Sequence, residues 1–267
     1  MSRSAPIGVF DSGMGGLTVM RELIQQLPNE SIIYFGDTAR VPYGPKSPDT
    51  VLRYSREITG YLRGEGIKAL VIACNTATAH ALPALRSEYD IPIIGVIEPG
   101  ARAAAAATKS RRVGVVGTAG TIKSHAYEKE LKKLLPDAQV TEQACALFVP
   151  LVEEGWLDTE ATRAIARNYL APIAAAEVDT VVLGCTHYPL IKTVIGNVLG
   201  RDVRLIDSAH ETARETAAVL AANGIANETP NAARYRFIAS DAPDTFLSLG
   251  RRFLGSEIDR VESLTLG

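Results

Sequence analysis

Short apolar runs alternate along the chain with longer segments in which apolar residues recur every three or four positions. The runs Ile7–Phe10, Ile32–Phe35, Ala69–Ile72 and Ile93–Ile97 are short and rich in β-branched residues, as buried strands are, and the segments between them have helical spacing. Strands that alternate with helices predict a parallel sheet with helices on both faces. The chain is therefore predicted to be an α/β protein.

The second part of the chain repeats the pattern of the first. Two pairs of segments match, namely Val113–Thr121 with Ile7–Gly13 and Val178–Thr186 with Ile67–Asn75. Cys185 lies 111 positions after Cys74, and the same offset places Ile93–Ile97 on a second strand-like run at 204–208. We therefore predict two similar parallel-sheet α/β domains related by an internal pseudo-repeat, with an active site in the cleft between them.

The predicted domains are 1–97 together with 209–267, and 98–208. The last segment begins with the helix-like run Thr212–Asn223 and is too short for a third domain of this type, so we expect it to pack on the first. The alanine-rich run Ala101–Ala107 lacks Gly and Pro and is predicted to be a helix. The alternative is a single barrel of eight βα units, which needs about 250 residues.

Composition narrows the choice of partners and compartment. The chain has 267 residues, 46% of them hydrophobic, and its 28 basic residues nearly balance 30 acidic ones. We therefore expect no nucleic-acid partner and no anionic membrane surface bound through bulk charge. No apolar run approaches the roughly 18 residues of a membrane span, and the start of the chain lacks the apolar part of a signal peptide. Three cysteines form no disulfide framework, so we predict a cytoplasmic protein.

Chemically active side chains gather where the predicted strands end, which is where open parallel sheets bind ligands. They are Asp11, Ser12, Cys74, Asn75, Thr76, Thr118, Cys185, Thr186 and His187. The repeat places Cys74 and Cys185 at matched positions, on opposite walls of one cleft. A thiol at a helix N-terminus meets backbone N–H groups and the positive end of the helix dipole, so we expect both thiols to be acidified.

Two similar acid–base groups on opposite faces of one ligand suit the inversion of a stereocentre by proton transfer. One group removes a proton from one face of a carbon, and the other delivers a proton to the opposite face. The neighbouring hydroxyls and amides suit carboxylates, and Asp11 suits an ammonium group or the orientation of a thiol. Three alternatives remain: a racemase or isomerase for another small acid such as aspartate, a binding protein without turnover, and a cysteine hydrolase that needs one thiol.

Other polar residues are expected to have structural roles. Cys145 lies between two alanines and is predicted to be a buried apolar residue, and His80, His125 and His210 are predicted to lie on the surface or on helix faces. Cys185 and His187 form a weak metal-binding pattern that no second pair completes, so no metal is expected. The glycines at 13, 15 and 16 match neither a dinucleotide fingerprint nor a P-loop, although a phosphate at that helix start remains an alternative.

Four motifs resemble those of the glutamate racemases, members of the cofactor-independent aspartate/glutamate racemase superfamily. They are Asp11–Gly16 (DSGMGG), Asp37–Gly44 (DTARVPYG), Cys74–Ala77 (CNTA) and Gly184–Pro189 (GCTHYP). The resemblance extends over nearly the whole chain, with the motifs in the family's order. It implies racemisation of glutamate by two bases without a cofactor, which supplies D-glutamate for bacterial cell-wall peptidoglycan. Members of this family are often dimers, so the resemblance also allows a homodimer.

The resemblance also implies roles for individual residues. Cys74 would exchange the proton of the D-enantiomer and Cys185 that of the L-enantiomer. Asp11 and His187 would assist, one beside each thiol, and Glu153 would help the second thiol, although its sequence context is that of a solvated helix end. The implied substrate-binding residues are Asp11, Ser12, Tyr43, Gly44, Asn75, Thr76, Thr118, Thr186 and His187.

Overall fold

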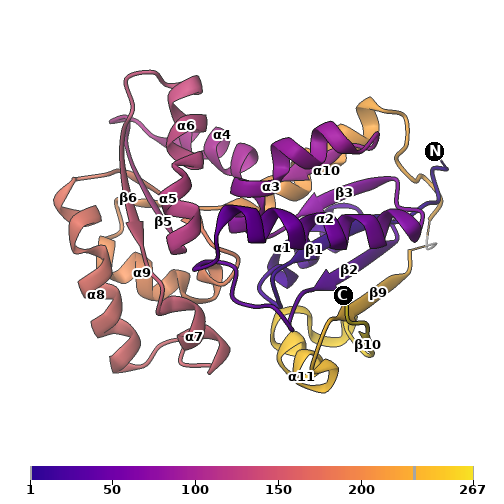
Figure 1. The fold of residues 1–267 in the computed structure, drawn as a ribbon. Helices are drawn as coiled ribbons and strands as arrows, with labels where there is room; N and C mark the ends of the chain where they lie inside the picture. The colour runs from indigo at the N-terminus through magenta and orange to yellow at the C-terminus, as the bar shows by residue number, and fades with distance from the viewer. Residues whose placement is uncertain (1, 231–232, 267) are drawn as a thin grey trace.

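Two separate parallel sheets form the frame of the molecule (Figure 1). The structure is a computed structural model, and it describes residues 2–230 and 233–266. Within these residues the strands pair in a six-stranded sheet, with order β10-β9-β2-β1-β3-β4, and a four-stranded sheet, with order β6-β5-β7-β8. Neither is a closed eight-stranded barrel, so the barrel alternative is wrong and the two-sheet α/β prediction is confirmed.

The first sheet contains the four strands predicted from the start of the chain and two more from its end. Its strands are β1 (Ile7–Asp11), β2 (Ile32–Gly36), β3 (Ala69–Ile72), β4 (Ile93–Gly95), β9 (Tyr235–Ala239) and β10 (Glu262–Ser263). β4 is shorter than predicted, because Val96 caps a helix that begins at Ile97. β9 pairs with β2, so the last segment of the chain extends this sheet rather than only packing on it.

The second sheet has the same strand order as the first. Its strands are β5 (Arg112–Gly117), β6 (Gln139–Ala144), β7 (Thr180–Gly184) and β8 (Arg204–Asp207). The order β6-β5-β7-β8 corresponds to β2-β1-β3-β4, with β3 and β7 as equivalent strands. The offset of 111 positions that relates the two cysteines also relates β3 to β7 and β4 to β8. The internal repeat predicted from the sequence is thereby confirmed.

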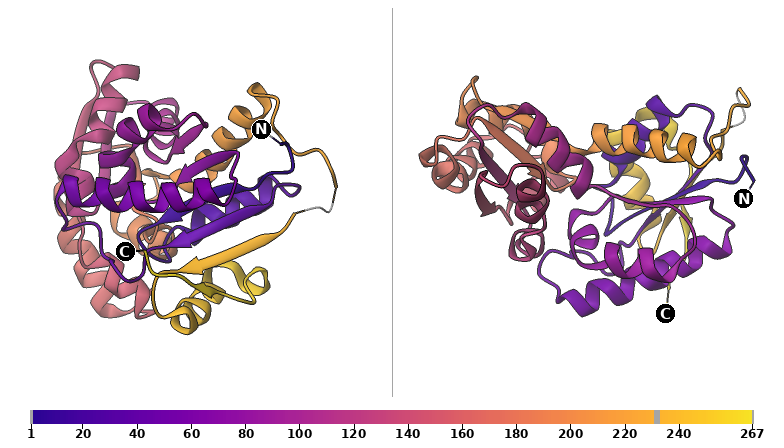
Figure 2. Two further views of the ribbon diagram at one scale, coloured as in Figure 1. Left: turned by 45° about the vertical axis from the view of Figure 1, so that its right-hand side comes forward. Right: turned by 90° about the horizontal axis from the view of Figure 1, so that it is seen from above.

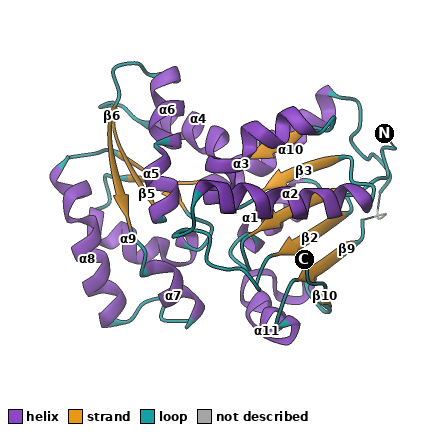
Figure 3. Ribbon diagram, viewed as in Figure 1, coloured by secondary structure: helices purple, strands orange, loops and turns teal. Residues whose placement is uncertain are grey.

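Helices cover both faces of each sheet (Figure 3). Around the first sheet and the chain between the sheets they are α1 (Leu17–Gln26), α2 (Pro48–Gly64), α3 (Asn75–Glu88), α4 (Ile97–Ala107), α10 (Ser208–Ala222) and α11 (Pro243–Leu254). Around the second sheet they are α5 (Ala119–Ser124), α6 (Ala126–Leu134), α7 (Phe148–Glu153), α8 (Glu160–Ala175) and α9 (Lys192–Leu199). The alanine-rich run predicted to be helical belongs to α4.

Successive side chains along each buried strand point to opposite faces of the sheet, and this alternation divides the core into layers. On β1, Ile7 and Val9 pack with α1 and α10, whereas Phe10 packs on the opposite face with α2 and α3. Residues of β5 divide in the same way, since Val115 belongs to the first cluster and Val116 to the cluster under α8 and α9. One apolar cluster is therefore shared by both sheets, and α4 and α10 lie within it.

The two sheets form two lobes that are joined along one side (Figure 2). α4 packs against α6 and against β7 and β8 of the second sheet, and also against α10, which packs on α1. The division of the chain into 1–97 with 209–267 and 98–208 stays a prediction. In the part of the chain that the structure describes, no helix has both the length and the apolar character needed to cross a membrane.

Candidate active site

The carboxyl ends of β1 and β3 face those of β5 and β7 across a small cavity of about 30 Å³. Its lining residues are Ser12, Val41, Pro42, Tyr43, Gly44, Cys74, Asn75, Thr76, Thr118, Val149, Cys185, Thr186 and His187. Two predicted site residues lie just outside the lining: Asp11 is buried behind it, and Glu153 contacts His187. The sequence analysis missed Val41, Pro42 and Val149, because apolar residues next to a motif carry no chemical signal.

Cys74 follows β3 by two residues and caps α3. Its Sγ accepts a hydrogen bond from the backbone N–H of Ala77 at 3.4 Å and lies 3.8 Å from Ser12 Oγ. Burial, together with the neighbouring Asp11, nevertheless raises the pKa of the Cys74 thiol to about 12. The sequence-based expectation of an acidified thiol is therefore wrong for Cys74, because removal from water outweighs the helix N-terminus.

Cys185 has a different set of neighbours. A short 3₁₀-helix (Tyr188–Ile191) follows it, so the thiol does not cap an α-helix as the repeat predicts. Its Sγ lies 3.9 Å from His187 Nδ1, and His187 Nε2 lies 3.1 Å from Glu153 Oε1. Burial alone would lower the pKa of His187, but its hydrogen bonds with Cys185 and Glu153 raise that pKa to about 10. The imidazole is therefore a cation at neutral pH.

Asp11 is fully buried between the two cysteine environments. Its Oδ2 accepts the backbone N–H of Gly13 at 2.9 Å, whereas its Oδ1 has no hydrogen-bond partner among the described residues. Burial raises the pKa of Asp11, and the positive charge of His187 partly offsets this effect. An unpaired buried carboxylate oxygen is unfavourable in the absence of a ligand. The same atom can accept a hydrogen bond from an ammonium group.

The glycines of the first motif allow the two sheets to approach each other. A Cβ at Gly15 would lie 2.4 Å from atoms of the His187 ring and 2.4 Å from Thr186 Oγ1. Thr18, at the start of α1, donates a hydrogen bond to the carbonyl of Thr186 at 3.2 Å. The position therefore requires glycine because α1 packs directly against the second cysteine motif.

A group of hydroxyls joins the first domain to the second. Thr76 Oγ1 lies 2.8 Å from Thr118 Oγ1 and 3.2 Å from Thr121 Oγ1. Thr118 also caps α5 by accepting the backbone N–H of Thr121. Asn75 accepts a hydrogen bond from Tyr127 through Oδ1, but its Nδ2 is buried and has no partner among the residues that the structure describes. A donor placed in this way can bind a substrate carboxylate.

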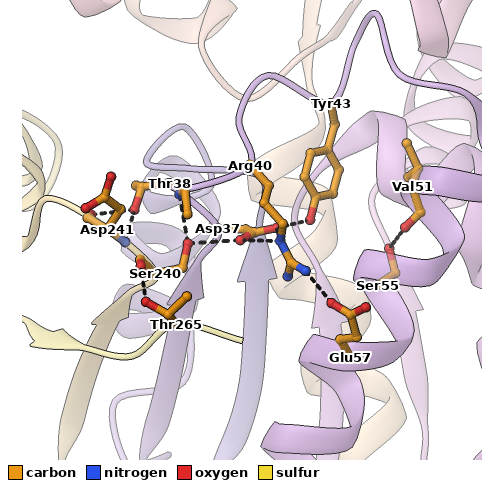
Figure 4. Close-up of polar contacts among 11 residues, drawn as sticks. Asp37, Thr38, Arg40, Tyr43, Val51, Ser55, Glu57, Ser240, Asp241 and Thr265 are labelled. Carbon is orange, nitrogen blue, oxygen red and sulfur yellow. Dashed lines mark hydrogen bonds and ion pairs between the residues drawn. The ribbon is translucent and has the colours of Figure 1, made fainter. Parts of the chain in front are cut away.

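A buried aspartate holds the loop that carries Tyr43 and Gly44 (Figure 4). Asp37 accepts hydrogen bonds from Tyr43 Oη and from Arg40 Nε, and its Oδ1 accepts one from Ser240 Oγ at 2.9 Å. Arg40 also pairs with Glu57 of α2. Burial, followed by the charge of Asp37, raises the pKa of Tyr43, so its phenol stays neutral and donates. The sequence analysis missed this role because Ser240 lies 203 positions away.

The other cysteine and histidines lie outside the cavity. Cys145 is buried, as predicted, and its Sγ lies 3.7 Å from the carbonyl oxygen of Gln143. His80 is partly buried on α3, whereas the side chains of His125 and His210 are more than half exposed, and each pairs with glutamate. None of the four lines the cavity with the two cysteines.

Comparisons with known proteins find relatives of this chain. A family model described as Asp/Glu/hydantoin racemase matches residues 7–216. A glutamate racemase of Geobacter metallireducens is 55% identical over 260 residues, which are 97% of this chain and 96% of that protein. A glutamate racemase of Neisseria meningitidis is 48% identical and covers 100% of this chain and 99% of its own.

Solved structures give the same result. The glutamate racemase isoform RacE1 of Bacillus anthracis has a TM-score of 0.94 at 42% identity, covering 99% of this chain and 98% of that one. The Francisella tularensis glutamate racemase in complex with D-glutamate has a TM-score of 0.93 at 39% identity, with the same coverage. The chain therefore belongs to the Asp/Glu/hydantoin racemase family.

Proposed function

We propose that this protein is a glutamate racemase that moves the Cα proton between two thiols without a cofactor. The observation that carries the proposal is that Cys74 and Cys185, at equivalent strand ends, line one cavity whose other polar residues are mostly hydroxyl and amide groups. Related structures contain D-glutamate in the Francisella tularensis protein and L-glutamate in the Escherichia coli protein. These complexes favour glutamate over aspartate as the substrate.

The surroundings of the thiols support a direction for each half-reaction. In L-to-D conversion, the Cys185 thiolate removes the Cα proton, and the electron pair left on Cα spreads onto the carboxylate. The Cys74 thiol then delivers its proton to the opposite face, which leaves D-glutamate and a Cys74 thiolate. The cationic His187 supplies the countercharge for a Cys185 thiolate, and the raised pKa of Cys74 keeps its proton available. D-to-L conversion reverses each step.

Removal of a Cα proton by a thiolate needs substantial help from the rest of the site. Positioning of the reacting groups can contribute roughly 7–11 kcal/mol in favourable cases. Fixed donors stabilise charge on the substrate carboxylate, and exclusion of water strengthens both effects. We assign these contacts to Ser12, Gly44, Asn75, Thr76, Thr118 and Thr186, which line the cavity. Tyr43 also lines the cavity and is assigned to packing against the substrate, since its hydroxyl donates to Asp37. Asp11 and His187 complete the set, and Glu153 orients His187.

The product implies a wider role. We propose that the enzyme supplies D-glutamate for bacterial peptidoglycan synthesis in the cytoplasm, as its resemblance to glutamate racemases implies. A homodimer is proposed on the same basis. The corresponding test is the loss of D-glutamate from cell-wall precursors when the protein is depleted, with recovery when D-glutamate is added.

The central test is incubation of each glutamate enantiomer with the protein in deuterium oxide. We expect the product of opposite handedness to carry solvent deuterium at Cα. Cys74→Ser and Cys185→Ser should each reduce racemisation by at least about 10²- to 10⁴-fold, because each removes one acid–base group. Cys145→Ala serves as the matched control and should retain turnover.

Three outcomes would contradict the proposal. Retention of the original Cα hydrogen through inversion would exclude two-base transfer, and an absence of exchange would favour a binding protein. Full activity of either serine variant would favour a mechanism with one thiol. A parallel assay with aspartate separates glutamate specificity from racemisation of another small acid.

A further inference from the structure

One histidine and two glutamates gather on the second domain outside the catalytic cavity. His125 connects α5 to α6, Glu128 lies in the first turn of α6, and Glu142 lies on β6. One ligand atom from each residue, the His125 nitrogen and one oxygen of each glutamate, lies within 4.8 Å of the other two. None of these side chains lines the cavity that contains the two cysteines.

Glu142 has the least exposed side chain of this cluster. Its side chain is only 8% exposed, and its Oε2 lies 2.6 Å from His125 Nδ1. Its Oε1 is buried and has no hydrogen-bond partner within the described part of the chain. A carboxylate that is removed from water and only half satisfied is unfavourable unless a further positive group binds it. The carboxylate therefore has capacity for another ligand.

The nearby lysines already have partners. Lys132 pairs with Oε1 of Glu128 at 2.6 Å, which leaves Oε2 of Glu128 directed at His125 Nδ1, 3.4 Å away. Lys129 donates to the carbonyl of Ser124 at 2.8 Å. Two carboxylate oxygens and one imidazole nitrogen thus lie within 4.8 Å of one another, although the two lysines reduce the negative charge around them.

We propose that His125, Glu128 and Glu142 bind a divalent transition metal ion, with Zn²⁺ as the best match. Zinc takes imidazole and carboxylate ligands in tetrahedral geometry, with bonds of about 2.0–2.2 Å, so its ligand atoms lie about 3.3 Å apart. The Glu128–His125 separation already has this value, and the shorter Glu142–His125 contact opens by about 0.7 Å. Mg²⁺ and Ca²⁺ fit less well, because they prefer six or more oxygen ligands.

The three side chains leave the fourth coordination position of a tetrahedral ion free, and on the exposed side of the site a water molecule fills it. The His125 side chain is 56% exposed, so the ion reaches the site from solvent. Binding uses the lone pair of His125 Nδ1 and therefore replaces the contact between His125 and Glu142. The ion connects the α5–α6 junction to β6 and thereby stabilises the folded second domain. The sequence analysis expected no metal because it considered only the closely spaced Cys185 and His187.

Zinc binding to the intact protein tests this site directly. Equilibrium dialysis should show that His125→Asn and Glu142→Gln each weaken the affinity for one equivalent of Zn²⁺ by at least about 10-fold. Asparagine suits position 125 because it tolerates the left-handed backbone found there, where φ is 53°. The melting temperature of the unsubstituted protein should rise with zinc, whereas that of the two variants should not.

Two controls locate the bound ion. His210→Asn removes another exposed histidine that pairs with a glutamate, Glu22, and should leave zinc binding unchanged. His187→Asn removes the histidine beside Cys185 and should also retain the equivalent assigned to the new site. Unchanged zinc affinity in both cluster variants would overturn the proposal. Loss of all zinc binding in His187→Asn would likewise overturn it and would place the ion in the catalytic cavity.

Discussion

At the scale of single residues, the two cysteines occupy equivalent strand ends but have opposite electrostatic neighbours. Cys74 lies near the buried Asp11, whose negative charge adds to the effect of burial and keeps the thiol protonated. Cys185 lies beside His187, which Glu153 helps to keep positively charged. The repeat therefore supplies two similar positions, and the surrounding residues make them chemically different in the free protein.

The charge of His187 predicts a pH dependence of stability. Its pKa is about 10 in the folded protein and about 6.5 when unfolded, so its contribution is fully present below pH 6.5 and is lost as the pH rises through 10. We expect the free energy of unfolding to fall by about 1–2 kcal/mol between pH 6.5 and 8.0, below the pH of about 8.5 near which cysteine thiols of the unfolded chain titrate. Urea denaturation at the two pH values measures this change.

The matched variants for this measurement are His187→Gln and His210→Gln. His187→Gln should lose most of the pH dependence, because the raised proton affinity disappears with the imidazole. His210 is exposed, and its replacement should leave the slope unchanged. If the free energy of unfolding changed with pH equally in the unsubstituted protein and in His187→Gln, another group would cause the pH dependence.

At the scale of elements, the segment between β2 and α2 shows how a loop can present binding groups with little freedom. Asp37 follows β2 directly and joins Tyr43 and Arg40 of this loop to Ser240, just after the neighbouring strand β9 (Figure 4). A single buried carboxylate thus fixes the path of the chain on one wall of the cavity. Asp37 does not line the cavity, so its role is that of a positioning residue.

We expect Asp37→Asn to impair racemisation through Tyr43. Loss of the charge leaves Arg40 and the Tyr43 hydroxyl without a full acceptor. The weaker positioning should cost about 1–3 kcal/mol of transition-state stabilisation, which lowers kcat/KM by roughly 5- to 150-fold. Tyr43→Phe removes the same contact, so the double variant should be little worse than Asp37→Asn alone. Steady-state kinetics of the three variants, with circular dichroism to verify folding, makes the comparison.

A nearby substitution separates positioning from general disturbance. Ser55 lies in α2, donates to the carbonyl of Val51 and has no contact with Asp37, so Ser55→Ala should retain kcat/KM. Fully additive effects of Asp37→Asn and Tyr43→Phe would refute the coupling between these residues.

The elements also show what a sequence can reveal before a structure exists. β1, β3 and β7 were predictable because each is a short apolar run that ends in a polar motif, and these ends supply most of the cavity lining. β9 and α11 were not predicted, because nothing in the local pattern indicates that Tyr235 pairs with Ile32, about 200 positions earlier. The raised pKa of Cys74 was equally hidden, since burial depends on packing between distant segments.

At the scale of the whole molecule, a buried ion pair joins segments from both ends of the chain. Lys68, just before β3, is fully buried and pairs with Glu30 at 2.5 Å. Its ammonium group also donates to the carbonyls of Arg3 and Ile225, near the N-terminus and after α10. Glu30 in turn accepts the backbone N–H of Asn227. The pair therefore holds the segment after α10 against the amino ends of β2 and β3.

We expect Lys68→Met to destabilise the protein by about 3–5 kcal/mol, because it leaves the Glu30 carboxylate buried without a countercharge. Adding Glu30→Gln should recover much of this loss, since a neutral amide needs no ion partner. Urea denaturation of the single and double variants measures both effects. Removal of the exposed Arg56–Glu88 pair is the control and should change stability very little. A double variant no better than Lys68→Met would point to the lost carbonyl contacts instead.

The 30 Å³ cavity has a consequence for the speed of the enzyme. Such a volume leaves no room for an amino acid, so we expect the lobes or the Tyr43 loop to separate when glutamate enters and leaves. Product escape then becomes a gated diffusive event, which limits turnover in many enzymes. We expect kcat to decline as sucrose raises solvent viscosity. The control is a bulky polymer, which raises the bulk viscosity without slowing motion at the scale of a small molecule and should therefore have little effect on kcat. Turnover indifferent to sucrose would instead make proton transfer the slow step.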